Sequence, residues 1–194
     1  VFDTATDLEE WATADQYAYA ASELATPESF RAEYPDREFT DENVASRVQH
    51  RKALSLAYDA WALYNQGNTE LAFERFAEAD AVGSVTYLGV PNNPLYTFWG
   101  RAALAEGDFD QAVKLLGAEA LFGQNGPGAE VYLREAFVAK NGDDEGLDEF
   151  LWATRNELAK SVDDFTLLDY EGNEVGMADA SAGKVTLLAF WFPT

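Results

Sequence analysis

The sequence predicts a mainly α-helical fold, with helix–turn–helix units over about residues 1–160 and a short β region over about residues 161–194. Three observations support this division. Apolar residues recur at helical spacing through the first part of the chain. A glycine-centred pattern repeats there three times. The last 32 residues change to short apolar runs separated by turn-forming residues, which is typical of strands.

The composition argues against several classes of partner and site. The chain has 13 Lys and Arg against 35 Asp and Glu, a formal net charge of −22. Nucleic acids and anionic membrane surfaces are bound through cationic side chains, so we expect neither as a partner. Because the sequence contains no cysteine, it has no disulfide, thiolate metal site or thiol nucleophile.

The sequence predicts no membrane-spanning segment, because it has no run of about 18 apolar residues. The first residue is Val1, and no signal peptide is recognisable. We expect either the processed product of an exported protein or a piece of a longer chain.

Two helices are predicted near the N-terminus. Residues 6–9 (Thr-Asp-Leu-Glu) form a capping box that begins a helix reaching about Leu24. The expected apolar stripe of this helix consists of Trp11, Ala14, Tyr17, Ala18, Ala21 and Leu24. Thr26 and Pro27 begin a short second helix, because proline suits the first helical position, and Pro35 ends it.

A third helix should begin at Thr40, since Asp41 and Glu42 then lie at the positive end of the helix dipole. Its helical character continues to Asn65. One unbroken helix and two helices separated between residues 49 and 52 both fit the pattern.

The repeated pattern is marked by Gly67, Gly107 and Gly142, which are 40 and then 35 residues apart. The residues at equal intervals after these glycines are Ala72, Phe76 and Ala79, then Ala112, Leu116 and Glu119, then Leu147, Leu151 and Thr154. A small residue, Ala60 or Gly100, precedes the first two glycines by seven positions, but Glu135 has this place in the third unit.

This pattern resembles the tetratricopeptide (TPR) repeat, whose helix–turn–helix unit has about 34 residues. The resemblance implies that each glycine ends the first helix of a pair, that the small residues let the two helices approach closely, and that the repeats bind a protein partner within a larger complex. A loop over residues 83–94 explains the longer first spacing. The break over residues 123–128 is expected to be the most flexible stretch, and the helices should end near Lys160.

The β region contains a predicted hairpin and one further strand. Residues 165–168 are a short apolar run, and the Glu-Gly-Asn sequence of residues 171–173 suits the following turn. Residues 185–192 are almost continuously β-branched and aromatic, as in a strand buried on both faces.

The order of these segments resembles the start of the TlpA/ResA-like (AhpC/TSA) branch of the thioredoxin superfamily. The matching stretches, within about 32 of 194 residues, are Asp164–Leu167, Asp169 with Gly172, and Gly183–Trp191. In that family a Cys-x-x-Cys motif follows the central strand at once. Residues 192–194 (Phe-Pro-Thr) depart from the Ala-Thr-Trp often found there. The resemblance therefore implies an incomplete thioredoxin-like region, a hairpin plus one central strand, that stops before the expected Cys-x-x-Cys.

No catalytic, cofactor-binding or metal-binding residue is predicted, and no cofactor is implied. His50 is the only histidine, so a helix-surface position is expected rather than a metal site. Residues 141–146 lack the ligand spacing of an EF-hand loop and fall where the third unit needs its turn. Ser161 and Ser181 lack the Gly-x-Ser-x-Gly frame of a hydrolase nucleophile.

Paired acidic residues and the tryptophans were also considered as possible site residues. The acids at 9–10, 41–42 and 163–164 are expected at helix starts and at a strand entry, not across a sugar-binding cleft. The tryptophans either pack in the core or line a peptide-binding groove, and we prefer the core. They are Trp11, Trp61, Trp99, Trp152 and Trp191.

Two hypotheses about function follow. In the first, the sequence is part of an exported TlpA-like thiol–disulfide oxidoreductase with a TPR protein-interaction module, and is inactive as it stands because it carries no Cys-x-x-Cys. In the second, it is a non-catalytic TPR scaffold of a larger extracytoplasmic assembly. A solute- or peptide-binding protein with a deep tryptophan-lined pocket is a third, weaker alternative. We expect a periplasmic or secreted location, with any membrane association through a segment outside this sequence.

Overall fold

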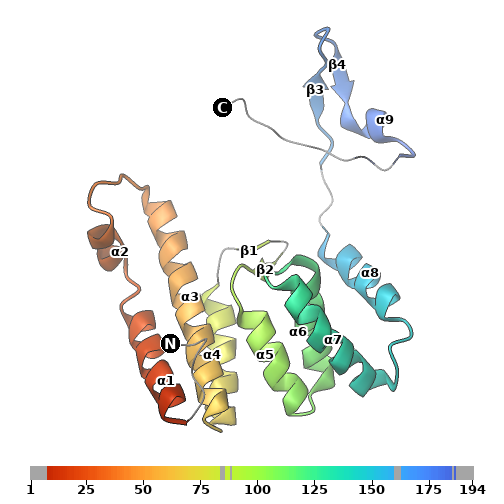
Figure 1. Cartoon of the computed structure of the whole chain (residues 1–194). Coiled ribbons are helices and arrows are strands. Elements are labelled where there is room, and N and C mark those ends of the chain that lie inside the picture. The colour runs from red at the N-terminus through yellow and green to blue at the C-terminus, as the bar shows by residue number, and fades with distance from the viewer. Residues whose placement is uncertain (1–7, 84–85, 88, 160–162, 185, 187–194) are drawn as a thin grey trace. The chain divides into compact units, whose positions relative to one another are not determined.

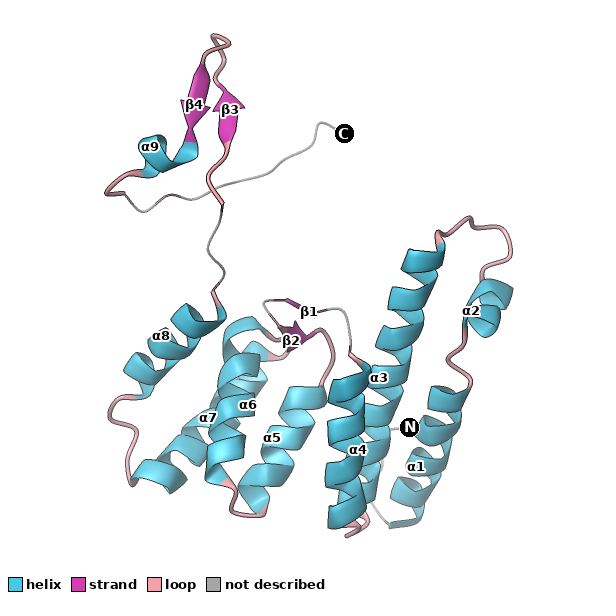
Figure 2. Ribbon diagram, turned by 180° about the vertical axis from the view of Figure 1, so that it is seen from behind, coloured by secondary structure: helices cyan, strands magenta, loops and turns pink. Residues whose placement is uncertain are grey.

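The computed structural model describes residues 8–83, 86–87, 89–159, 163–184 and 186. The chain divides into two compact units, Val1–Ala159 and Lys160–Thr194. The described residues form nine helices and two small antiparallel sheets, so the predicted mainly helical class is confirmed. Figure 1 and Figure 2 show the helices of the first unit from opposite sides.

The two N-terminal helices are α1 (Leu8–Glu23) and α2 (Pro27–Glu33). The predicted capping residues Thr6 and Asp7 lie outside the described residues. The α2 prediction is confirmed: the Thr26 hydroxyl accepts a hydrogen bond from the Ser29 backbone N–H at 3.2 Å, and Pro27 occupies the first position.

The buried face of α1 differs from the predicted stripe. Ala14 and Ala18 are buried, but Tyr17 is 66% exposed and Leu24 is 68% exposed. Ser22, which is 1% exposed, completes the buried face in place of the exposed Ala21. Residues spaced by four positions therefore face α3, and this narrow stripe of small side chains leaves the large ones outside.

The third helix, α3 (Asp41–Asn65), is one unbroken helix of 25 residues. The Thr40 hydroxyl caps it by accepting a hydrogen bond from the Asn43 backbone N–H at 3.2 Å. It packs against α1 and against α4 (Thr69–Val82). Neighbours on two sides bury its apolar residues along most of its length, so no break is needed.

The remaining helices of the first unit are α5 (Leu95–Ala105), α6 (Phe109–Phe122), α7 (Gly126–Asn141) and α8 (Leu147–Leu158). A glycine with positive φ follows the first helix of each predicted pair: Gly67 at +82°, Gly107 at +80° and Gly142 at +97°. Other residues would pay about 1–2 kcal/mol in this left-handed conformation. The chain therefore forms three consecutive helix–turn–helix units at the positions of the sequence repeat.

In the second unit, the two helices approach closely because Gly100 has no side chain. A Cβ on Gly100 would lie only 2.6 Å from Leu116 Cγ, so α5 and α6 meet where glycine leaves room. In the third unit, Glu135 is exposed instead. There α8 packs on α6, where Phe150 lies against Gly117.

The repeat positions form the centre of the core. All six residues of the first two units are 1% exposed or less: Ala72, Phe76, Ala79, Ala112, Leu116 and Glu119. One cluster joins α3, α4 and α5 around Phe76, which stacks on Trp99 with ring centroids 6.0 Å apart. A second cluster joins α6 and α7 around Leu116 and Leu133.

The predicted loop at residues 83–94 contains an unpredicted ribbon. Thr86–Tyr87 (β1) pairs antiparallel with Val90–Pro91 (β2). So few residues carry little of the alternation that marks a strand, and the ribbon is consistent with the predicted break between helices.

The predicted break at residues 123–128 is wrong for its second half, because α7 begins at Gly126. Proline at position 127 suits a first helical turn, which explains the early start. The remaining connection is held by the buried Glu119, whose Oε1 accepts a hydrogen bond from the Asn125 backbone N–H at 3.2 Å.

The second unit contains the predicted hairpin. Strands β3 (Thr166–Leu168) and β4 (Glu174–Gly176) pair antiparallel, and the helix α9 (Met177–Ser181) follows. Asp169 Oδ1 closes the turn by accepting hydrogen bonds from the backbone N–H groups of Glu171 and Asn173 at 2.9 and 2.8 Å. The predicted strand at 185–192 lies outside the described residues apart from Thr186.

Candidate functional site

Side chains from α3, α5 and α7 form a continuous surface, which we call the aromatic–arginine face. Each of these helices is the first of its helix–turn–helix unit. The members of the face are all half-buried: Tyr58, Trp61, Tyr64, Phe98, Arg101 and Tyr132.

The rings of this face contact one another from α3 to α5. Trp61 stacks on Phe98 with centroids 5.1 Å apart and planes 12° from parallel, and on Tyr64 at 5.8 Å. Tyr58 meets the edge of Phe98 at 5.5 Å. The Tyr64 hydroxyl donates a hydrogen bond to Glu106 Oε1 at 3.1 Å, and burial raises the pKa of Tyr64. These contacts hold the rings in fixed orientations.

Arg101 extends the face from α5 to α7. Its guanidinium carbon lies 4.7 Å from the centroid of the Trp61 ring and 4.5 Å from that of Tyr132. Although the chain has 35 acidic residues, none that the structure describes forms an ion pair with Arg101. The rings hold the guanidinium while its N–H donors remain available, which suits it to bind a carboxylate.

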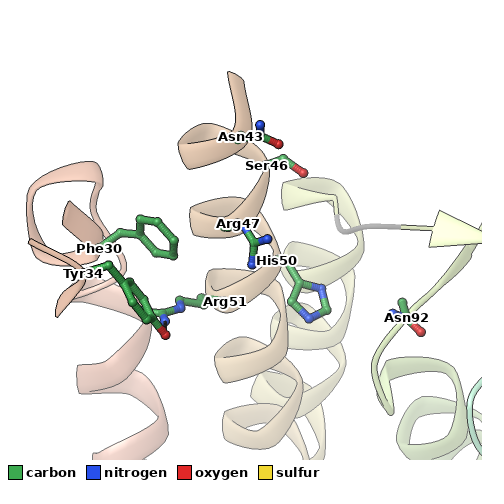
Figure 3. A pocket seen from close by; sticks show the side chains of 8 residues that line it. All are labelled: Phe30, Tyr34, Asn43, Ser46, Arg47, His50, Arg51 and Asn92. Carbon is green, nitrogen blue, oxygen red and sulfur yellow. Dashed lines mark hydrogen bonds between the residues drawn. The ribbon is translucent and has the colours of Figure 1, made fainter. Parts of the chain in front are cut away.

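A second site lies between α2 and α3, and we call it the α2–α3 cavity. It has a volume of about 400 Å³. Phe30 and Tyr34 come from α2 and its C-terminal cap, and Asn92 comes from the loop before α5 (Figure 3). The other five lining residues belong to α3: Asn43, Ser46, Arg47, His50 and Arg51. None of the eight is acidic, in a chain of net charge −22.

The arginines of this cavity have different surroundings. Arg51 forms a bidentate ion pair with Glu33, with N–O distances of 2.5 and 3.1 Å, which lowers the pKa of Glu33. Arg47 lies over the ring of Phe39 at 5.6 Å, and none of the acids in the described segments forms an ion pair with it. Burial lowers the pKa of His50, so its imidazole is neutral at neutral pH.

A third concavity of about 410 Å³ is bordered by α5, α6 and α8. Tyr96 and Trp99 line it, and the Tyr96 hydroxyl donates a hydrogen bond to Asp80 Oδ1 at 3.2 Å. Burial, with the nearby Asp80, raises the pKa of Tyr96 to about 12. The indole N–H of Trp99 is buried and has no hydrogen-bond partner within the described ranges. The groove is amphipathic, with both apolar and charged walls.

Two buried acids tie helices together. Asp59, 1% exposed, has Oδ2 at 2.8 Å from Arg75 Nε, and the carboxyl of Asp15 also influences it. Burial and Asp15 raise the pKa of Asp59 to about 8, against the attraction of Arg75. Arg75 also pairs with Glu78, so two carboxyl groups share one guanidinium, which limits how far Arg75 can offset the burial of Asp59. Burial likewise raises the pKa of Glu119.

The residues weighed as site candidates do not come together. His50 lies on α3, as predicted, and residues 141–146 form the turn between α7 and α8. Ser181 Oγ donates a hydrogen bond to the Met177 carbonyl at 2.5 Å, which is a helix contact. Asp164 Oδ1, before β3, accepts one from the Ala178 backbone N–H at 2.9 Å. Ser161 lies outside the described residues.

The tryptophans are dispersed. Trp61 belongs to the aromatic–arginine face, Trp99 lines the third concavity and Trp152 is 61% exposed on α8. Trp11 is half-buried on α1, and Trp191 lies outside the described residues. No two tryptophans line the same one of these three sites.

The described part of the chain offers no group of three or more metal-ligating side chains. In the same segments, no helix combines the length and apolar character needed to cross a membrane.

Neither Arg101 nor the α2–α3 cavity was predicted from the sequence. Arg101 follows the predicted close-contact residue Gly100 and lies one turn from Phe98, which places it on the first helix of the second unit. Its contacts with α3 and α7 depend on how the units stack. The sequence contains only a weak signal for the cavity. Arg47 and Arg51 are one helical turn apart, which places two cations on one helix face in an acidic chain.

No family model, curated protein or solved structure matches this chain.

Proposed function

We propose that the helical unit is a protein-interaction module that binds a segment of a partner protein on the aromatic–arginine face. The observation that carries the proposal is the continuous set of oriented rings across α3, α5 and α7, together with the Arg101 guanidinium, which forms no ion pair with the acids that the structure describes. Tyrosine, tryptophan and arginine are the residues most enriched among energetically dominant interface positions. The TPR-like resemblance supports an extended or helical peptide segment as the ligand.

In this proposal Arg101 anchors a carboxylate of the partner, and the rings contact its apolar side chains. The guanidinium pays little ordering entropy on binding, because Trp61 and Tyr132 already hold it. Such an anchor supplies specificity as well as affinity, since the planar fork of arginine matches a carboxylate in two parallel hydrogen bonds.

The proposed parent protein is an exported TlpA-like thiol–disulfide oxidoreductase, with its Cys-x-x-Cys motif after Thr194. The hairpin from Thr166 to Gly176 supports this proposal, because the resembling family has a hairpin before its central strand. In thiol–disulfide exchange, a low-pKa thiolate attacks a substrate disulfide and the second cysteine resolves the mixed disulfide. The alternative is a non-catalytic scaffold, which is equally compatible with the aromatic–arginine face because that face needs no redox centre.

Partner capture tests the interaction proposal. Tagged protein is incubated with extract from the natural source, and Arg101→Gln is compared with Arg134→Gln, an exposed arginine of α7 that pairs with Asp144. A hot-spot arginine is worth about 2 kcal/mol or more, so Arg101→Gln should weaken capture about 30-fold. Arg134→Gln should bind as the wild type does. Equal binding by both variants would refute the role of the aromatic–arginine face.

The redox proposal has an independent test. Intact-mass analysis and C-terminal peptide sequencing of the natural protein should find a Cys-x-x-Cys after Thr194, and that protein should reduce insulin disulfides. A natural protein without these cysteines would leave the scaffold alternative.

A further inference from the structure

We infer that the α2–α3 cavity binds a small organic oxyanion, that is, a carboxylate or a phosphate ester carried on an apolar group. This site is separate from the aromatic–arginine face, and the inference does not depend on the interaction proposal. The charge of the cavity lining, the fixed position of the cavity walls and the cavity volume support this inference.

The charge of the lining is opposite to that of the chain. The net charge is −22, yet the charged residues of the lining are Arg47 and Arg51. Glu33 neutralises most of the charge of Arg51, so Arg47 supplies the net positive charge. An anion that enters this cavity meets no carboxylate in the lining, and it meets the guanidinium of Arg47, which has no ion-pair partner within the described ranges.

Side chains with neutral hydrogen-bond donors line the same cavity as Arg47. Asn43 and Ser46 lie on the same helix, about one turn and one residue before it, and Asn92 approaches from the loop before α5. Figure 3 shows the α3 side chains between the two rings of α2 and Asn92. Amide and hydroxyl groups can donate to the oxygens of a carboxylate or phosphate that a guanidinium holds.

The walls of the cavity are held in place by contacts that do not involve a ligand. The rings of Phe30, Tyr34 and Phe39 pack with centroid distances of 5.1 to 6.1 Å. Arg51 lies over the Phe30 ring at 4.9 Å and Arg47 over the Phe39 ring at 5.6 Å. Each guanidinium thus has an aromatic support on one face, which reduces the entropy lost when it binds an anion.

The size and the aromatic wall indicate an organic ligand. A volume of about 400 Å³ is larger than an inorganic ion requires and lies within the range of small-molecule sites. Phe30 and Tyr34 provide an apolar wall opposite the donors. The ligand therefore combines an oxyanion, held by Arg47, with an apolar group against these rings.

Titration of the ¹⁵N-labelled chain with phenyl phosphate and with benzoate tests this inference. Near physiological ionic strength the Debye length is about 8 Å, so the distant acids contribute little and local contacts dominate. At least one of the two probes should shift the backbone amides of residues 30–34 and 43–51 with saturation. It should bind at least five times more tightly than inorganic phosphate or acetate, which lack the apolar group. Which probe binds identifies the oxyanion.

Two variants separate the cavity from general electrostatics. Arg47→Gln should weaken binding at least tenfold. Lys52→Gln removes the same charge from the same helix but does not line the cavity, so it should change affinity less than twofold. Circular dichroism checks that both variants are folded. Absence of saturation with both aromatic anions, or equal weakening by both variants, would overturn the inference.

Discussion

The stability of the helical unit should depend on pH through Asp59. Its pKa is raised from 3.8 to about 8 by burial and by Asp15. The unfolded carboxyl is ionised above about pH 5, whereas the folded one keeps its proton until the pH approaches its raised pKa. The folded state therefore binds the extra proton, and stability that is fully present at low pH is lost as the pH rises toward 8.

The expected loss can be worked out between about pH 6 and about pH 8. The free energy of unfolding falls by about 1.4 kcal/mol for each pH unit in which only the folded state holds the proton. At the upper limit, half of the folded molecules have lost the proton of Asp59. Asp59 should therefore cost about 2 kcal/mol over this range. His50 acts in the opposite direction, since burial lowers its pKa and stability rises as the unfolded imidazole loses its proton.

Urea unfolding, followed by circular dichroism at several pH values, measures this loss. Asp59→Asn removes the titrating group and keeps the shape of the side chain, so its free energy of unfolding should fall about 2 kcal/mol less than that of the wild type between these limits. The comparison cancels the contribution of His50. Glu74→Gln, an exposed carboxyl on α4, should keep the wild-type slope. Equal slopes for wild type and Asp59→Asn would refute the assignment of a retained proton to Asp59.

Two further predictions concern packing and the turns. Phe76→Ala should lower the free energy of unfolding by about 3–5 kcal/mol in a urea titration, because it empties a fully buried position stacked on Trp99. Leu71 is 43% exposed on the same helix, so Leu71→Ala should lower it by less than about 1 kcal/mol. Similar losses in these two variants would contradict the assigned core. Gly107→Ala should cost about 1–2 kcal/mol in thermal unfolding, although a Cβ there meets no atom within 4 Å, because φ is +80°. Unchanged stability would mean that this turn is not left-handed in solution.

Local chemistry explains why the helix boundaries were predictable. Thr26, Thr40 and Gly67 act through backbone groups a few residues away, so the sequence around each already contains its partners. The six buried repeat positions were predictable for a related reason, since a helix pair must bury one face against its neighbour and the spacing marks that face. The hairpin turn at Asp169 is local in the same way.

The failures follow from contacts that local sequence does not specify. On α1, Tyr17 and Leu24 satisfied the helical period but are exposed, because the position of α3 determines which stripe is covered. The start of α7 moved to Gly126, where the buried Glu119 of α6 holds the preceding residue. In both cases the local sequence was interpreted correctly as apolar or as a break between helices. A neighbouring helix then determined which residues are buried on α1 and where α7 begins.

The sequence by itself determined the helical class, the glycine-ended units, the hairpin and the acidic surface, because these depend on interactions within a few residues or on totals over the chain. Only the tertiary structure decided the candidate sites. Arg101 lies between rings from α3 and α7, which are far from it in sequence, and the α2–α3 cavity combines Phe30, Arg47 and Asn92. The physical reason is that a binding site needs groups from several elements at fixed distances, and packing between helices sets those distances.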